Sequence, residues 1–274
     1  MKTIGVIGLG IIGGVWARHY AAAGKLAGSW NRTPQPSAPA WKNSPEEVAA
    51  AADVVQIVVA DPAAVAAVLE KILPRLGPGN IVMQSTTIDP ASNEQFSAQV
   101  TARGARYLAA PFTGSKPAAE QRQIVFFLGG DAELVAEMEP LLALVSAHRF
   151  HVGTGAQAAA LKLALNLNIA AQMEGLSEAL TMARRAGIGD DVFFRVLEKN
   201  VAASPLVKLK EAKLRAGDFS PQFSVKHMHK DMRLAVATVG AGRLPLLETV
   251  REQLRRAEAG GGGNEDFSAL LKLL

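Results

Sequence analysis

The chain has 274 residues, a formal net charge of +4 at pH 7 and no cysteine. This length suits two domains of ordinary size, and the 49% of apolar residues can bury a substantial core. The lack of cysteine excludes disulfides, thiolate catalysis and a cysteine-based metal site. Because the five histidines show no ligand-pair spacing, we expect no metal centre.

Neither a membrane nor a nucleic acid is expected as a partner. No apolar run reaches membrane-spanning length, and the N-terminus leads directly into a strand without a signal-peptide pattern, which favours a cytoplasmic location. The basic residues are dispersed and form no recognisable nucleic-acid motif. We therefore attribute the positive charge to attraction of small anionic molecules.

The first predicted elements are a strand over 2–7 and a helix over 12–23, separated by the turn Gly8-Leu9-Gly10-Ile11-Ile12-Gly13. In a dinucleotide-binding βαβ unit the first glycine allows the tight bend, the second lets the backbone approach the pyrophosphate, and the third permits close helix-to-strand packing. The helix N-terminus offers free N–H groups to the phosphates. A lone GxGxxG is a weak signal, but this strand and helix context favours dinucleotide binding over a merely structural turn.

The end of the second strand indicates which dinucleotide is bound. Asn31, Arg32 and Thr33 stand where a carboxylate usually accepts hydrogen bonds from the adenosine ribose, and residues 1–45 contain no aspartate or glutamate. A carboxylate would repel a 2′-phosphate, whereas the Arg32 guanidinium can fork onto it and the other two side chains can donate further hydrogen bonds. The sequence therefore predicts NADP(H) rather than NAD(H).

Strands and helices then alternate up to about residue 152, which predicts an α/β domain with a Rossmann-type, doubly wound sheet. The expected strands cover 54–59, 79–83, 106–108, 124–130 and 149–152, and the expected helices cover 45–52, 62–76, 90–103 and 131–147. From Gly155 onward only helices are expected, over 156–186, 190–200, 204–216, 224–240, 245–258 and 266–273, with a flexible glycine loop at 260–263. We place the boundary at 153–155, between an NADP-binding domain (1–154) and an all-helical substrate and oligomerisation domain (155–274).

Two polar residues lie near the start of the longest predicted helix. Lys162 and Asn166 are four positions apart in an otherwise apolar stretch, so they share one face. A lysine in such a helix must snorkel to water, pair with an acid or face a cavity. From the residues alone, snorkelling and a cavity both remain open.

At this point the chain resembles the β-hydroxyacid dehydrogenase family over essentially its whole length. Four markers occur in order: the glycine turn at 8–13, Ala110-Pro111-Phe112-Thr113-Gly114-Ser115, the Gly-x6-Lys-x3-Asn pattern from Gly155 to Asn166, and Lys230-Asp231. The resemblance implies hydride transfer between a nicotinamide and a small hydroxyacid or acid aldehyde. It makes Lys162 the general acid and Asn166 the residue that orients substrate and lysine. An ammonium suits reduction and a neutral amine suits oxidation, so we expect faster reduction than oxidation at neutral pH.

The resemblance also implies a substrate site. Thr113, Gly114 and Ser115 would hold the substrate carboxylate, with Phe223 and Asp231 on the substrate side. The commonest family form of the loop is Val-Ser-Gly-Gly. In this chain Phe112 and Thr113 replace Val and Ser, and Ser115 replaces the second Gly. The run 114–120 and Phe223 look more like the glyoxylate/succinic semialdehyde reductase branch, which favours those aldehydes, while the 3-hydroxyisobutyrate and tartronate semialdehyde types remain alternatives. The structural alternative for Thr113-Gly114-Ser115 is an ordinary glycine turn. The structural alternative for Phe223 is a residue of the hydrophobic core.

Matching to the family assigns further residues to the cofactor: Val59, Ala60 and Asp61 at a strand end, Thr86 near the nicotinamide ribose, and Lys230. The structural alternatives are a helix start at Asp61-Pro62, a helix cap at Thr86 and a solvated Lys230-Asp231 pair. We also expect Met228 and the glycine-rich segment to help line the substrate pocket.

Two other functions share this architecture. Related imine reductases usually carry Asp or Tyr in place of Lys162, and a non-catalytic chromatin-associated module has lost the lysine, so the lysine argues against both. Family members resembling this chain form dimers or tetramers. Because the long helix spans roughly 46 Å and is apolar around much of its circumference, we expect a second copy to bury part of it, giving a homodimer or homotetramer.

Overall fold

The computed structural model describes residues 1–274 as two compact units, Met1–Lys162 and Leu163–Leu274. The long helix α7 (Gly155–Arg185) begins in the first unit and continues into the second. The boundary that we expect at 153–155 lies where α7 begins, whereas the compact units divide within this helix.

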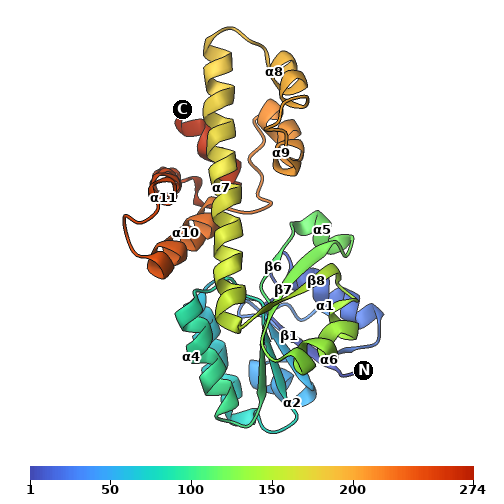
Figure 1. Cartoon of the computed structure of the whole chain (residues 1–274). Coiled ribbons are helices and arrows are strands. Elements are labelled where there is room, and N and C mark those ends of the chain that lie inside the picture. The colour runs from blue at the N-terminus through green and yellow to red at the C-terminus, as the bar shows by residue number, and fades with distance from the viewer. The chain divides into compact units, whose positions relative to one another are not determined.

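The first unit contains an eight-stranded, mostly parallel sheet with strand order β2-β1-β3-β4-β5-β7-β6, and β8 pairs with β7 (Figure 1). The parallel arrangement expected for the early strands is present throughout β1 to β5, whereas β7 runs antiparallel to β5 and β6. The strands are β1 (Ile4–Ile7), β2 (Leu26–Trp30), β3 (Val54–Ile57), β4 (Ile81–Gln84), β5 (Arg106–Ala109), β6 (Phe112–Thr113), β7 (Ile124–Gly129) and β8 (Ser146–Gly153).

The helices of this unit begin at clear signals. The side chains of Ser44, Asp61, Asp89 and Asp131 each accept a backbone N–H bond from the first turn of the helix that follows. The helix expected over 131–147 ends earlier, because residues from Ser146 onward pair with β7 instead. The helices are α1 (Gly13–Ala22), α2 (Pro45–Ala51), α3 (Pro62–Ile72), α4 (Pro90–Thr101), α5 (Lys116–Glu120) and α6 (Ala132–Leu142), with a short 3₁₀ helix at Leu73–Arg75.

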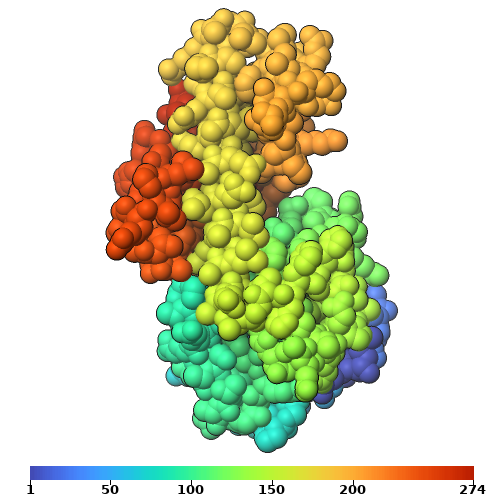
Figure 2. Space-filling model, in the orientation of Figure 1, coloured from blue at the N-terminus to red at the C-terminus, as the bar shows by residue number.

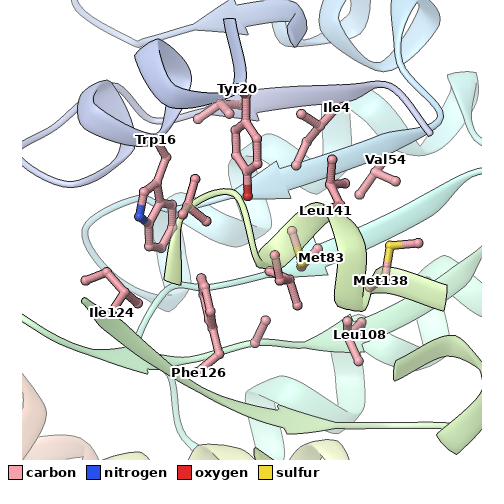
Figure 3. Close-up of a cluster of buried hydrophobic side chains, with 14 of the residues drawn as sticks. Ile4, Trp16, Tyr20, Val54, Met83, Leu108, Ile124, Phe126, Met138 and Leu141 are labelled. Atoms are coloured by element: carbon pink, nitrogen blue, oxygen red, sulfur yellow. The ribbon is translucent and has the colours of Figure 1, made fainter. Parts of the chain in front are cut away.

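Each face of the sheet has its own core, as a doubly wound fold requires. On one face, side chains of β1 and β3–β5 pack with α1, α5 and α6, and Trp16, Tyr20 and Phe126 are the largest fully buried residues. Figure 3 shows these three side chains together with Met83 and Leu108. On the other face, the same strands pack with α2, α3 and α4 around residues such as Val48 and Phe96.

The second unit is helical throughout, as the sequence predicts. Helices α8 and α9 lie on one side of α7, and α10 and α11 lie on the other (Figure 1). The expected final helix is a 3₁₀ helix, and the glycine segment expected to be a loop contains one further 3₁₀ turn. The elements after α7 are α8 (Asp190–Leu197), α9 (Pro205–Ala216), α10 (Val225–Val239), α11 (Pro245–Ala259) and the 3₁₀ helices Gly262–Asn264 and Phe267–Leu273. No helix is both long enough and apolar enough to cross a membrane.

A buried ion pair ties the end of the chain to α9. Lys210 Nζ lies 2.7 Å from Asp266 Oδ1, and these side chains are 1% and 0% exposed. Asp266 also accepts the backbone N–H groups of Gln222 at 2.9 Å, Phe223 at 3.1 Å and Ser268 at 3.1 Å. Burial alone would raise the pKa of the Asp266 carboxyl, but the ion pair and these hydrogen bonds hold that pKa below its ordinary value.

Candidate active site

The three glycines of the first turn are required for different reasons. Gly8 has φ +103°, and a Cβ atom there would collide with the Val58 carbonyl. A Cβ atom on Gly13 would collide with the Gly8 carbonyl. Gly10 differs, because a Cβ atom there would meet no protein atom within 4 Å. The fold therefore needs Gly8 and Gly13, whereas Gly10 leaves open space beside the backbone for a ligand.

The helix that follows this turn starts without a cap. No side chain caps α1, and its first turn carries no acidic residue, in contrast to the four capped helices of this unit. The turn also lies where the strand order reverses, because β2 and β3 flank β1 on opposite sides. The Gly14 and Val15 N–H groups bond to the Gly10 and Ile12 carbonyls. The positive end of the helix dipole still favours phosphate at such a switch point, so the residues present fit a dinucleotide.

The residues after β2 divide into two roles. Asn31 Oδ1 accepts the Leu9 N–H at 3.0 Å, and Asn31 Nδ2 donates to the Thr33 carbonyl at 2.9 Å. Asn31 therefore positions the glycine turn, and its Nδ2 is engaged by the Thr33 carbonyl through one of its two N–H groups. Arg32 and Thr33 have exposed side chains. Gln35, which no sequence motif indicated, donates to the Leu9 carbonyl at 3.4 Å.

The ends of β3 and β4 are joined by polar side chains. Thr86, only 3% exposed, accepts the Val59 N–H at 2.9 Å. Gln84 in turn bonds both the N–H and the carbonyl of Thr86. Thr86 is therefore not the cap of α4, which is Asp89, and the structural alternative that we gave for Thr86 is wrong.

The strand end after β3 has one residue that caps a helix, Asp61, and two that do not, Val59 and Ala60. The Asp61 side chain accepts the Ala64 N–H at 2.8 Å and caps α3, which confirms the helix start at Asp61-Pro62. Val59 is half-buried and Ala60 is exposed. Of the expected cofactor residues here, Val59 and Ala60 are therefore the ones whose side chains have no capping task.

The short connection after β6 contains a glycine with a positive φ angle. Gly114 has φ +139°, and a Cβ atom there would collide with the Ile124 side chain, so glycine is required. Thr113 and Ser115 are half-buried. Ser115 stands at the start of α5 but makes no capping bond with its side chain. Thr113 ends β6 and Ser115 stands at the N-cap of α5, so the two hydroxyl groups flank Gly114.

Lys162 lies beside the start of this loop. Its Nζ is 5.9 Å from the centroid of the Phe112 ring, within the range of a cation–π interaction. The Lys162 side chain is half-buried. The second and third sequence markers, far apart along the chain, are thus adjacent in the first unit.

The second unit joins the third and fourth markers. Asn166, 2% exposed, donates from Nδ2 to Asp231 Oδ2 at 2.6 Å, and Asp231 is 1% exposed. Lys230 Nζ lies 2.7 Å from Asp231 Oδ1, although no aligned hydrogen bond reaches that oxygen. The structural alternative of a solvated Lys230-Asp231 pair is therefore wrong, because the Asp231 side chain is buried. Lys162 and Asn166 are one turn apart along α7 and therefore share one face of that helix.

Two other expected substrate residues lie against the helical core. The Phe223 ring stacks on His227 at 6.3 Å and meets Phe267 edge-on at 6.2 Å, which supports the core alternative for Phe223. Met228 is fully buried, so its expected place in the pocket lining is wrong. The reason is the helical period of α10, which places Met228 on the same apolar face as Val225 and Met232.

Comparison with known families agrees with this arrangement. Residues 3–153 match the family of the NAD binding domain of 6-phosphogluconate dehydrogenase. Residues 156–274 match the family described as NAD-binding of NADP-dependent 3-hydroxyisobutyrate dehydrogenase. The chain belongs to the β-hydroxyacid dehydrogenase family. It is an NAD(P)-dependent dehydrogenase that uses a nicotinamide cofactor.

The relatives of this dehydrogenase include reductases and a nuclear factor found in several animals. Glyoxylate/succinic semialdehyde reductase 2, chloroplastic, of Arabidopsis thaliana is 30% identical over 99% of this chain and 79% of its own length. The cytokine-like nuclear factor N-PAC of Mus musculus is 26% identical, and the chain spans 50% of its length. The crystal structure of 3-hydroxyisobutyrate dehydrogenase from Salmonella typhimurium superposes with a TM-score of 0.89 at 28% identity, covering 100% of both chains.

Several residues of this dehydrogenase were not assigned roles from the sequence. Gln84 could have been noticed, because it is a polar residue at the end of an apolar strand and proves to be buried. Trp16 and Gln35 gave no such signal, since their contacts with Phe112 and Leu9 join segments that only the fold brings together.

Proposed function

We propose that this dehydrogenase is an NADPH-dependent reductase of small acid aldehydes, with glyoxylate and succinic semialdehyde as the first candidates. The observation that carries the proposal is the position of Lys162. It precedes Asn166 by one turn of α7, and its ammonium lies close to the ring of Phe112, the residue before Thr113. A dehydrogenase of the 3-hydroxyisobutyrate or tartronate semialdehyde type is the alternative.

The cofactor proposal rests on charge. The N–H groups at the start of α1 would hold the pyrophosphate, and Arg32 with Thr33 would hold the 2′-phosphate. No carboxylate occurs among residues 1–45 to repel that phosphate. When bound, NADPH would supply the hydride. The backbone near Val59, Ala60 and Thr86 would adjoin the nicotinamide end, and Lys230 would lie on the cofactor side.

Lys162 would supply the proton. Its ammonium would protonate the carbonyl oxygen, where negative charge develops in the transition state. Asn166, held by Asp231, would orient substrate and lysine, and Thr113, Gly114 and Ser115 would receive the substrate carboxylate. Because the acid form of lysine prevails at neutral pH, reduction should be faster than oxidation there.

The test is NADPH oxidation with glyoxylate, succinic semialdehyde, tartronate semialdehyde and methylglyoxal, with NADH in parallel. We expect turnover with NADPH that falls roughly 10²- to 10⁴-fold in Lys162→Ala, as for loss of a general acid. Lys199→Ala, an exposed lysine, is the matched control and should keep full activity. The ranking of substrates would identify the branch of the family.

Two negative results would each redirect the assignment. Reduction of cyclic imines but not of aldehydes would identify an imine reductase. Protein that is folded and binds NADPH, yet turns over no substrate, would be a non-catalytic module, which is relevant because one relative is a nuclear factor.

We further propose that the protein is a homodimer or homotetramer. Helices α7, α8 and α9 enclose an apolar groove of about 550 Å³, lined by residues such as Leu176, Phe193 and Val207. Nearby, Val196 is 62% exposed and Val201 is fully exposed. This region can be followed in yellow and orange in Figure 2. Exposed apolar surface of this kind is typical of an interface, and a second copy is the occupant that we propose.

A further inference from the structure

Three aromatic rings from separate elements form a cluster in the first unit. Trp16 of α1 meets Phe112 of β6 edge-on, with ring centroids 4.8 Å apart. Phe126 of β7 lies 5.3 Å from Trp16 and 6.1 Å from Phe112. Trp16 and Phe126 are fully buried and lie side by side in Figure 3. Phe112 is the half-buried member, so two buried rings hold one ring that is partly accessible.

The accessible ring lies next to a cation. Lys162 Nζ is 5.9 Å from the Phe112 centroid. The face of an aromatic ring carries negative electrostatic potential, which attracts an ammonium group. A lysine side chain has many rotamers, so even a weak attraction increases the fraction of time that its ammonium spends near the ring.

The position of Phe112 along the chain places its ring next to the Thr113–Ser115 loop. Phe112 immediately precedes Thr113, and its backbone pairs with Phe126 of β7 in the sheet. The ring is therefore fixed relative to the Thr113–Ser115 loop by both the aromatic cluster and the strand pairing. An aliphatic residue could fill the same space, but it would not attract the ammonium.

We propose that Phe112 is a positioning residue that holds the Lys162 ammonium beside the Thr113–Ser115 loop through a cation–π interaction. Trp16 and Phe126 fix the ring for this role. The inference rests on the proposed function in one respect, namely that Lys162 donates the proton.

The first test separates the charge effect from packing. We expect Phe112→Leu, which keeps an apolar side chain but removes the ring, to lower kcat for aldehyde reduction roughly 2- to 5-fold. The NADPH dissociation constant should not change, and Phe112→Tyr, which keeps the ring, should restore kcat. Phe96→Leu, which removes a buried ring from the opposite face of the sheet, is the control for a general loss of packing. Equal kcat in Phe112→Leu and wild type would overturn the proposal.

The second test changes the ring potential with little change of shape. Phenylalanine carrying one, two and three fluorine atoms is incorporated at position 112, and kcat should decline in steps as the ring face becomes less negative. The same series at position 96 should leave kcat constant. A flat series at position 112 would mean that the ring only packs.

The third test does not depend on turnover. Lysines are dimethylated with ¹³C-formaldehyde, and the Lys162 resonance is identified by its absence in Lys162→Arg. The ring current of Phe112 should displace this resonance, and Phe112→Leu should return it towards the position of exposed lysines. If wild type reduces no aldehyde but the resonance moves, the proposed function fails and the contact stands. If wild type is active and the resonance does not move, the inference alone fails.

Discussion

At the scale of single residues, Arg32 is expected to decide between the two nicotinamide cofactors. Its side chain is exposed after β2, while the neighbouring Asn31 is engaged with the glycine turn. Arg32→Glu should weaken NADPH binding by roughly 10- to 100-fold, because a charge-assisted hydrogen bond is lost and a repulsive charge is added. NADH binding should change little. Fluorescence titration with both cofactors measures this, and Arg75→Glu, at an exposed position of the 3₁₀ helix Leu73–Arg75, is the control.

If Arg32→Glu binds NADPH as tightly as wild type, the 2′-phosphate is held elsewhere, and the argument from the missing carboxylate fails with it.

The Asn166–Asp231 hydrogen bond is expected to contribute to stability as well as to the site. Both side chains are buried, so Asn166→Ala would leave Asp231 Oδ2 without its donor. We expect the free energy of unfolding to fall by about 1–3 kcal/mol, the cost of an unsatisfied buried polar group. Urea denaturation measures the change. Asn168→Ala, at an exposed position of the same helix, should alter stability by less than about 0.5 kcal/mol.

Glu174 gives the protein a pH-dependent weakness. Burial, with repulsion from Glu178, raises the pKa of this carboxyl to about 6, although Arg256 acts in the opposite direction. An acid whose pKa is raised in the folded state contributes stability at low pH, and that contribution is lost as pH rises through the raised value. Glu174→Gln should therefore be more stable than wild type above about pH 6, by on the order of 1 kcal/mol after allowance for solvent screening.

The measurement for Glu174 is urea denaturation between pH 4.5 and 8. The difference between Glu174→Gln and wild type should grow with pH, whereas Glu198→Gln, at an exposed position, should track wild type throughout. A difference that is constant over this range would show that Glu174 does not titrate as we expect.

At the scale of elements, the sequence predicted what local signals determine. The strand β1 is a continuous apolar run, and β3 to β5 are apolar except for Gln56, Gln84 and Arg106. The helices α2, α3 and α4 follow a capping Ser or Asp with proline in the first turn. The two-residue strand β6 was not predicted, because its only basis is pairing with β7, which no local pattern reveals. The early end of α6 has the same cause, since residues from Ser146 join β7 in the sheet.

In the candidate site, too, the sequence predicted the local features but not the contacts between distant segments. The spacing of Lys162 and Asn166 is local, so the sequence predicted their shared helix face. The bond from Asn166 to Asp231 joins residues 65 positions apart, and the contact of Lys162 with Phe112 joins two elements. The sequence named these residues only through the family resemblance, and it did not indicate that Asp231 is buried or that Asn31 binds the glycine turn.

The buried ion pair should be essential to the arrangement of α9 and the C-terminal 3₁₀ helix. Lys210→Met would leave the Asp266 carboxylate buried without its cation, and we expect a loss of about 3–5 kcal/mol in the free energy of unfolding. Lys208→Met, exposed on the same helix, is the matched control. Denaturant titration measures the free energy of unfolding of both variants. If Lys210→Met were as stable as Lys208→Met, the ion pair would not have the importance that we expect.

At the scale of the whole molecule, the apolar groove of α7, α8 and α9 bears on assembly. Val196→Glu should favour smaller species, because it places a charge on surface that we expect a second copy to cover. Light scattering coupled to size-exclusion chromatography measures the mass. Val239→Glu, an exposed position on α10 outside the groove, should assemble as wild type does. A monomeric wild-type protein would contradict the proposal.

The aromatic cluster around Trp16 also determines what spectroscopy can observe. All three tryptophans and both tyrosines of the chain lie between Trp16 and Tyr107, and thus in the first unit. The helical unit contains phenylalanine but neither tryptophan nor tyrosine. Intrinsic fluorescence therefore monitors the sheet-containing unit alone. Far-ultraviolet circular dichroism, in contrast, receives a large contribution from the helices of the second unit. Comparing the two signals during denaturation would reveal whether the units unfold together or in sequence, without any added label.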